Sequence, residues 1–326
     1  MTKYLLTLWN RIWFSAIDPL PMAACRIGLG LLLTVWFIGL SPNWERFYAA
    51  DGIISLNDKI IAGPPTIDEW NVMQVTEGVL PTRAYWVVGL VASVTLAIGF
   101  CSRISSALLF AIINILVRRN TYVVNGEEMV ARIFLLYGMF APWGYACSVD
   151  AWLRKRFVNS ANSSNIATPW AWSLRMMQIH FLLIYTISLG YKFAQDSAWI
   201  EGDALHWTIA SDRWWRMGEM SWITLSLGGL LRKWMTYGTI LIEGTAPILI
   251  WFRPTRRYVI GAIFFLHIGI AIMIPGVVFF SLLMVVGVLN FVPAETYRQI
   301  AVSVSRFARK PFAVPQPKIR MAAPVH

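Results

Sequence analysis

Apolar residues gather into long stretches that follow one another along most of the chain, separated by shorter polar segments. A helix needs roughly 20 mostly apolar residues to cross about 30 Å of hydrocarbon. The pattern therefore predicts eight membrane-crossing helices, over residues 21–41, 83–101, 104–118, 127–147, 171–191, 234–252, 257–274 and 276–292. We expect an all-α integral membrane protein whose transmembrane domain covers residues 21–295.

Two longer polar segments, residues 42–82 and 192–233, follow odd-numbered predicted helices and so belong to the same face. The second segment holds five tryptophans among charged residues: Trp199, Trp207, Trp214, Trp215 and Trp222. Indole rings prefer the headgroup level of a bilayer. We expect both segments to cap one face of the bundle, above a cavity suited to a lipid-like ligand.

The two ends of the chain differ from the apolar middle. In residues 1–20 the apolar positions recur at helical spacing: Leu5, Leu6, Trp9, Ile12 and Trp13. Arg11 and Asp18 interrupt this segment and it has no small-residue cleavage site, so it is not a signal peptide. We predict an amphipathic helix on the membrane surface. Residues 296–326 form a basic tail.

Composition and charge fix an orientation. Of the 326 residues, 57% are hydrophobic and 14% are charged, whereas about a quarter are charged in soluble domains. With both termini in the cytoplasm, the inner segments carry fifteen basic and three acidic residues, and the outer ones ten and thirteen. Basic residues favour the cytoplasmic side. The net charge of +11 therefore indicates topology and no nucleic-acid partner, and in a bacterial inner membrane the outer face would be periplasmic.

Motifs of several enzyme classes are missing from the sequence. It has no GxGxxG loop, P-loop, HExxH pair or paired CxxC, which disfavours nucleotide-dependent enzymes and zinc peptidases. His180 and His267 lie in the fifth and seventh predicted helices, but no third ligand of suitable spacing accompanies them, so we expect no metal. Each histidine is either a structural hydrogen-bonding group or, for His267 in particular, a donor to a bound quinone oxygen.

Ionisable residues inside predicted membrane helices are functional candidates, because a charge there is costly. Arg26 and Arg175 lie near a cytoplasmic end, where their long side chains are expected to snorkel to the interface. Glu243 is mid-helix and needs a partner, and Arg132 enters its own helix at a comparable depth. We predict an ion pair between Arg132 and Glu243 that either fixes helix register or serves chemistry.

Lys192 follows the outer end of the fifth predicted helix. Residues 185 and 188 lie seven and four positions earlier, so Tyr185, Ser188 and Lys192 share one helical face. A lysine at a membrane surface either snorkels into the headgroups or, held away from water, loses its charge more easily and acts as a base. From the pattern alone both interpretations stay open.

The segment IYTISLGYKFAQDSAWIEG resembles the stretch around the active-site lysine of the horizontally transferred transmembrane (HTTM) family, which includes the membrane part of vitamin K-dependent γ-carboxylase. The segments ERFYAADGIIS, NGEEMVARIFLLYGMFAPWGYACSVDAW and FFLHIGIAIMIPGVVFFSLLM are similar to other family segments in the same order. The resemblance covers roughly residues 20 to 295.

This resemblance implies a chemistry. Lys192 matches the lysine that deprotonates the hydroquinone, and His267 matches a histidine of a late helix. The hydroquinone would react with oxygen to give a strong base, in a dry pocket that we assign to Tyr185, Ser188, Trp199 and His180. Two features differ from the family: the chain has no large soluble C-terminal region, and acids stand in NGEEM where a second catalytic histidine is expected. Glutamate carboxylation is therefore disfavoured.

Two hypotheses follow. The first is a quinol-dependent enzyme with Lys192 as its base, which modifies a peptide or a lipid. The second is a non-enzymatic subunit that binds a quinone or stabilises a larger membrane complex through its tryptophan-rich outer face.

Overall fold

The computed structural model describes residues 2–53, 73, 81–120, 123, 126–157, 170–210 and 229–308. The elements in these ranges are all helices, which confirms the all-α prediction. The longer ones are α1 (Thr2–Trp13), α2 (Leu20–Leu40), α6 (Thr82–Ile98), α7 (Ser102–Arg119), α8 (Gly126–Gly138), α10 (Trp172–Gln195), α14 (Gly229–Leu249), α15 (Arg253–Met273), α16 (Val278–Val288) and α17 (Ala294–Ala308). The short ones are η1 (Ser41–Asn43), α3 (Trp44–Tyr48), η3 (Trp143–Tyr145), α9 (Val149–Phe157), α11 (Ser197–Glu201), α12 (Ala204–Ala210), η6 (Pro275–Val277) and η7 (Leu289–Phe291).

Each of the eight predicted apolar segments coincides with a helix: α2, α6, α7, α8, α10, α14, α15 and α16. The largest difference is at α8, which ends at Gly138; the ring of Trp143 in η3 packs where a side chain at Gly138 would lie. Helix α10 is longer than predicted: it continues to Gln195, past the predicted end at residue 191, so Lys192 belongs to the helix.

Length and composition allow only some of these helices to cross a membrane by themselves. Two stretches are long and apolar enough, Leu20–Tyr48 and Arg253–Met273. A third candidate is the pair Val278–Phe291 and Ala294–Ser303, which bends by 103° at its break. Helix α6 is apolar but shorter. A few apolar helices of this chain are thus able to span a bilayer.

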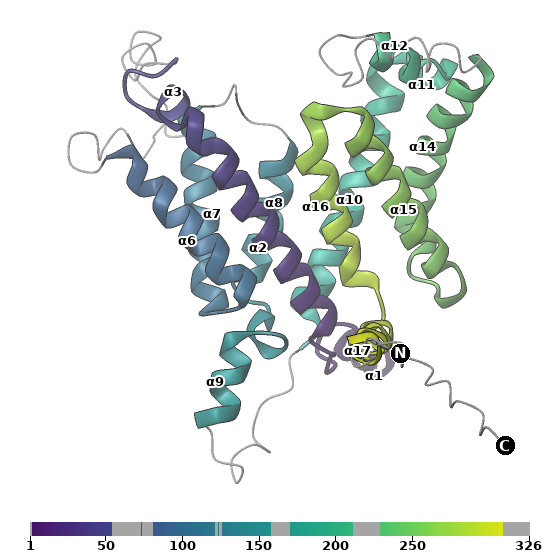
Figure 1. The fold of residues 1–326 in the computed structure, drawn as a ribbon. Helices are drawn as coiled ribbons and strands as arrows, with labels where there is room; N and C mark the ends of the chain where they lie inside the picture. The colour runs from purple at the N-terminus through teal and green to yellow at the C-terminus, as the bar shows by residue number, and fades with distance from the viewer. Residues whose placement is uncertain are drawn as a thin grey trace, which may run out of the picture.

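The helices form two groups that share α16 (Figure 1). Helices α2, α6, α7 and α8 pack side by side, and α10, α14 and α15 form the second group. Helix α16 contacts α2 and α8 on one side and α15 on the other, while α10 contacts both α8 and α14. Helices α1, α9 and α17 lie at one end of the assembly, and α3, α11 and α12 lie at the opposite end (Figure 1).

Glycines allow the closest contacts between helices. A Cβ atom at Gly30 of α2 would lie 2.5 Å from the backbone nitrogen of Ala97, so α2 and α6 approach each other through backbone. A Cβ atom at Gly287 of α16 would lie 2.5 Å from the ring of Phe181 and 2.7 Å from that of Phe134. These contacts fix α16 against α8 and α10, which in turn fixes the helix that carries Lys192.

Arg26 was expected to snorkel to the membrane interface, and this prediction is wrong: its side chain is fully buried. Its Nη1 donates to the carbonyl oxygens of Leu96 and Ala97 at 2.7 Å, and its Nη2 donates to that of Cys147 at 2.6 Å. Carbonyl groups at the last turn of a helix have no partner within that helix. The guanidinium of Arg26 therefore satisfies the end of α6 and ties it to the turn before α9.

Candidate functional site

Lys192 of α10 and Glu243 of α14 form an ion pair. The Nζ atom of Lys192 lies 2.5 Å from both carboxylate oxygens of Glu243. The exposed fractions of the two side chains are 14% and 9%. A charge pair held this far from water interacts more strongly than one on an open surface, because the local dielectric is lower. The pair joins the C-terminal end of α10, just before α11, to the C-terminal half of α14.

The predicted partner of Glu243 was wrong. Arg132 lies on α8, and its Nη1 donates to Oδ1 of Asn114 on α7 at 3.1 Å. Helix α14 packs on α10 and α15, while α8 packs on α7, α10 and α16. Equal depth in the bundle therefore did not make Arg132 and Glu243 neighbours. The carboxylate is instead neutralised by the lysine that the sequence pattern had singled out for another reason.

The polar face predicted on α10 points toward α14 and α15. Oγ of Ser188 donates to Glu243 at 3.4 Å. One turn further along α10, the hydroxyl of Tyr185 shares a hydrogen bond of 2.9 Å with Nε2 of His267 on α15. Tyr185 is 1% exposed and His267 is 3% exposed. The predicted stripe is thus a line of interhelical hydrogen bonds that begins at the ion pair and runs into the core.

The two histidines occupy different places. Among the residues described, Nδ1 of His267 has no hydrogen-bond partner, and the ring lies near that of Phe280, with 6.0 Å between ring centroids. His180 lies about 18 Å from Lys192 along α10, and its Nδ1 shares a hydrogen bond of 2.7 Å with the hydroxyl of Tyr137. The prediction that His180 lines the same pocket is therefore wrong, whereas His267 is joined through Tyr185 to the face of α10 that carries Lys192.

Trp199 covers the ion pair from the outer side. Its ring centroid is 4.4 Å from Nζ of Lys192, a cation–π geometry. Trp199 lies on α11, which begins at Asp196 because the side chain of this residue accepts a hydrogen bond from the backbone nitrogen of Ala198 at 2.9 Å. Helix α11 ends at Gly202, whose φ of 82° suits a residue without a side chain.

Two hydrogen bonds attach α11 and α12 to α14. The hydroxyl of Tyr237 donates to the carbonyl oxygen of Ile200 at 3.0 Å, and the backbone nitrogen of Leu205 donates to Oγ1 of Thr236 at 3.3 Å. The expected cap over the outer face is therefore present in its first part. Its remaining tryptophans, Trp214, Trp215 and Trp222, lie outside the described residues.

A pocket of about 380 Å³ lies beneath this cap, between α10, α12, α14 and α15. Its polar end is formed by Lys192, Glu243 and Trp199, with threonine side chains nearby. The rest of its wall is apolar and comes mainly from α15, from Phe265 to Met273. A volume in this range and a mostly apolar wall with few convergent polar groups are typical of small-molecule sites. Tyr185, Ser188 and His267 support this wall from behind and do not line it.

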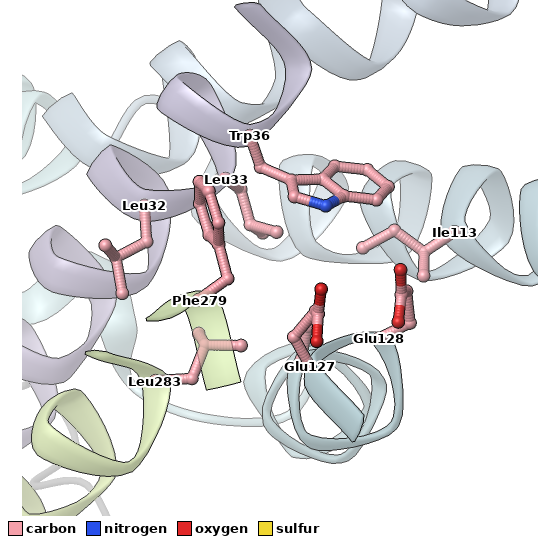
Figure 2. A pocket seen from close by; sticks show the side chains of 9 residues that line it. Leu32, Leu33, Trp36, Ile113, Glu127, Glu128, Phe279 and Leu283 are labelled. Atoms are coloured by element: carbon pink, nitrogen blue, oxygen red, sulfur yellow. The ribbon is translucent and has the colours of Figure 1, made fainter. Parts of the chain in front are cut away.

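A second pocket, between α2, α7, α8 and α16, is much smaller (Figure 2). Figure 2 shows Glu127 and Glu128 extending from α8 toward the side where Trp36 of α2 lies. These are the acids of the NGEEM segment, and they are 8% and 6% exposed. The cavity holds about 10 Å³, room for one water molecule. It is a packing space, and the first pocket is the better candidate for a ligand.

The sequence analysis missed the part of the site that comes from α14 and α15 other than Glu243. Thr236, Gly238 and Thr239 on α14 and Gly269 on α15 line the pocket. The signal that would have found them is a face of small residues at helical spacing within an apolar stretch. No protein-family model, curated protein or solved structure matches the chain.

Proposed function

We propose that this chain is a multi-pass membrane protein that binds a quinone or hydroquinone in the pocket beneath α11 and α12, and that the Lys192–Glu243 pair moves a proton there. The observation that carries the proposal is the ion pair itself, which forms the polar end of an otherwise apolar pocket. Such a pair is costly to bury and is retained where a site uses it.

The membrane assignment has support beyond the apolar composition. All eight predicted segments are helices, and eight crossings leave both ends of a chain on one face. Helices α1 and α17 do lie at the same end of the assembly (Figure 1). The basic excess of the sequence falls on the segments at that end, so we assign it to the cytoplasm and the end with Lys192 to the periplasm of a bacterial inner membrane.

The residues present fit a quinone. A flat, weakly polar headgroup matches the combination of an indole ring, an ammonium group and hydroxyls at the polar end. The hydroxyls come from Thr208 and Thr239, whose Oγ1 atoms donate to helix carbonyls at 2.9 and 3.1 Å. Each oxygen keeps a lone pair that can accept a hydrogen bond from a hydroxyl of a hydroquinone. The apolar remainder of the pocket matches a hydrocarbon substituent.

The proton chemistry follows from the geometry of the pair. Both carboxylate oxygens of Glu243 lie 2.5 Å from Nζ of Lys192, within reach of direct proton transfer. In the proposed step Glu243 takes a proton from Nζ, and Nζ takes the hydroxyl proton of a hydroquinone at the polar end of the pocket. A bound hydroquinone would supply an acidic hydroxyl and two electrons, with dioxygen as the electron acceptor, for the modification of a peptide or lipid.

The test uses the full-length protein purified in mild detergent. We expect native mass spectrometry to find a retained prenyl quinone, and we expect the protein to catalyse oxygen uptake in the presence of ubiquinol. Lys192→Met should abolish oxygen uptake while quinone is still retained. Lys233→Met is the matched control, because Lys233 lies near the same cap, on α14, and its side chain is 46% exposed. Wild-type protein that neither retains quinone nor consumes oxygen would contradict the proposal.

A non-enzymatic role is the second candidate, and the outer surface favours it. Trp207 on α12 and Trp234 on α14 are 63% and 67% exposed, and Ile200 on α11 is 56% exposed. Exposed apolar groups of this size are typical of contact surfaces. For an accessory subunit, Lys192→Met would change no activity, and partner membrane subunits would co-purify in a fixed ratio.

A further inference from the structure

Helices α14 and α15 are joined at one end and separate toward the end that carries α11 and α12 (Figure 1). The pocket lies between their separated halves. Gly238 of α14 and Gly269 of α15 both line it. A Cβ atom added at either glycine would meet no other atom within 4 Å. The space between the two helices is therefore open at these positions because neither helix places a side chain there.

The pocket also reaches the outer surface of the bundle. Phe265 lines it and is 74% exposed. Leu266, Ile270 and Met273 of α15 line the pocket together with Phe265, so its wall on this helix is apolar. In a membrane protein an apolar outer surface faces lipid. The pocket thus has a polar end at the ion pair and an apolar side opening between two helices.

We infer that the ligand is a single-tailed amphipathic molecule whose headgroup lies at Lys192 and Glu243 and whose long hydrocarbon tail passes Gly238 and Gly269 into the bilayer. The inference rests on the proposed function for the headgroup site. It adds that the tail is longer than the pocket, and it adds the route by which the tail reaches lipid, sideways between α14 and α15. A ligand that lacks a tail needs no opening toward lipid, and an entry from water would meet the cap with Trp199.

The two glycines offer a direct test, because larger side chains there fill open space. We would measure binding of two ubiquinones with the same headgroup, one with a short tail and one with a long tail, by ligand retention in detergent. Wild-type protein should bind the long-tailed probe about tenfold more tightly, since more apolar surface is buried. Gly238→Leu and Gly269→Leu should remove this preference and leave short-tail binding within about twofold of wild type.

Gly261→Leu is the matched control, since Gly261 lies on α15, also has no atom within 4 Å of an added Cβ, and does not line the pocket. It should change neither affinity. Thermal unfolding of each variant checks the fold, and Gly238→Ala and Gly269→Ala replace any leucine variant that is unstable, with a smaller loss of long-tail binding expected.

The outcomes separate the two proposals. If wild-type protein binds neither ubiquinone, the headgroup site itself fails. If it binds both and the glycine variants weaken neither, the headgroup site stands and the tail route is overturned. If the glycine variants weaken both probes equally, the glycines surround the headgroup and the tail route is again overturned.

Discussion

The hydroxyl of Tyr185 and Nε2 of His267 are joined by a hydrogen bond of 2.9 Å across the contact between α10 and α15, and both side chains are buried. This bond is the inner member of the polar line that starts at Lys192. Because His267 packs against Phe280 and has no other hydrogen-bond partner among the residues described, its position depends on Tyr185.

Removing the hydroxyl of Tyr185 should destabilise the protein. Tyr185→Phe leaves a ring nitrogen of His267 buried without its partner, a loss we expect to cost about 2 kcal/mol. Tyr137→Phe is the control, because Tyr137 makes the equivalent bond to His180 at a more exposed site and should cost less. Denaturation in mixed micelles measures both. Equal losses would show that burial of His267 adds nothing to the bond.

The Lys192–Glu243 pair should stabilise the packing of α10 on α14. Lys192→Met or Glu243→Leu alone leaves an unpaired charge, and we expect each to lower the free energy of unfolding by about 3 kcal/mol. The double variant Lys192→Met, Glu243→Leu removes both charges and should recover most of the loss. A double variant as unstable as the sum of the two singles would mean that the residues do not interact.

Arg26 should be irreplaceable by lysine. Its guanidinium reaches carbonyls of α6 and of the turn before α9 at the same time, which one ammonium group does not reproduce. We expect Arg26→Lys and Arg26→Met each to destabilise the protein by about 3 kcal/mol. Arg83, which is exposed, serves as the control, and Arg83→Lys should stay within about 0.5 kcal/mol of wild type. Rescue of stability by Arg26→Lys would contradict the geometry.

A single added methyl group should be tolerated at one glycine and harmful at another. Gly287→Ala places Cβ within 2.7 Å of two phenylalanine rings, and we expect a loss of about 2 kcal/mol. Gly261→Ala meets no atom and should be neutral or slightly stabilising, because alanine favours helix. The comparison uses the same chemical change in both helices, measured as the shift in unfolding midpoint.

The native cysteines test the orientation in the membrane. Cys101 and Cys147 are exposed free thiols, and they lie at the end of the bundle that we assign to the cytoplasm. A membrane-impermeant maleimide should leave them unlabelled in intact bacterial spheroplasts and label them after permeabilisation. A variant with Trp207→Cys on the cap should be labelled in both conditions. Labelling of the native cysteines in intact spheroplasts would reverse the topology.

The sequence was informative where a local pattern decides the structure. Apolar runs predicted the helices, and the spacing of Tyr185, Ser188 and Lys192 predicted a shared face, because helical geometry alone sets both. It failed for Arg26 and Arg132, since the distance of a residue from a helix end says nothing about which helix lies opposite. The pocket wall on α14 and α15 was missed for the same reason: it exists only where two particular helices separate.

Helix α14 holds Glu243 and also holds α11 and α12 through Thr236 and Tyr237. A tilt of α14 would therefore move α11 and α12, separate Glu243 from Lys192, and widen the space beside Gly238 at the same time. Entry of a ligand and separation of the ion pair would then occur together.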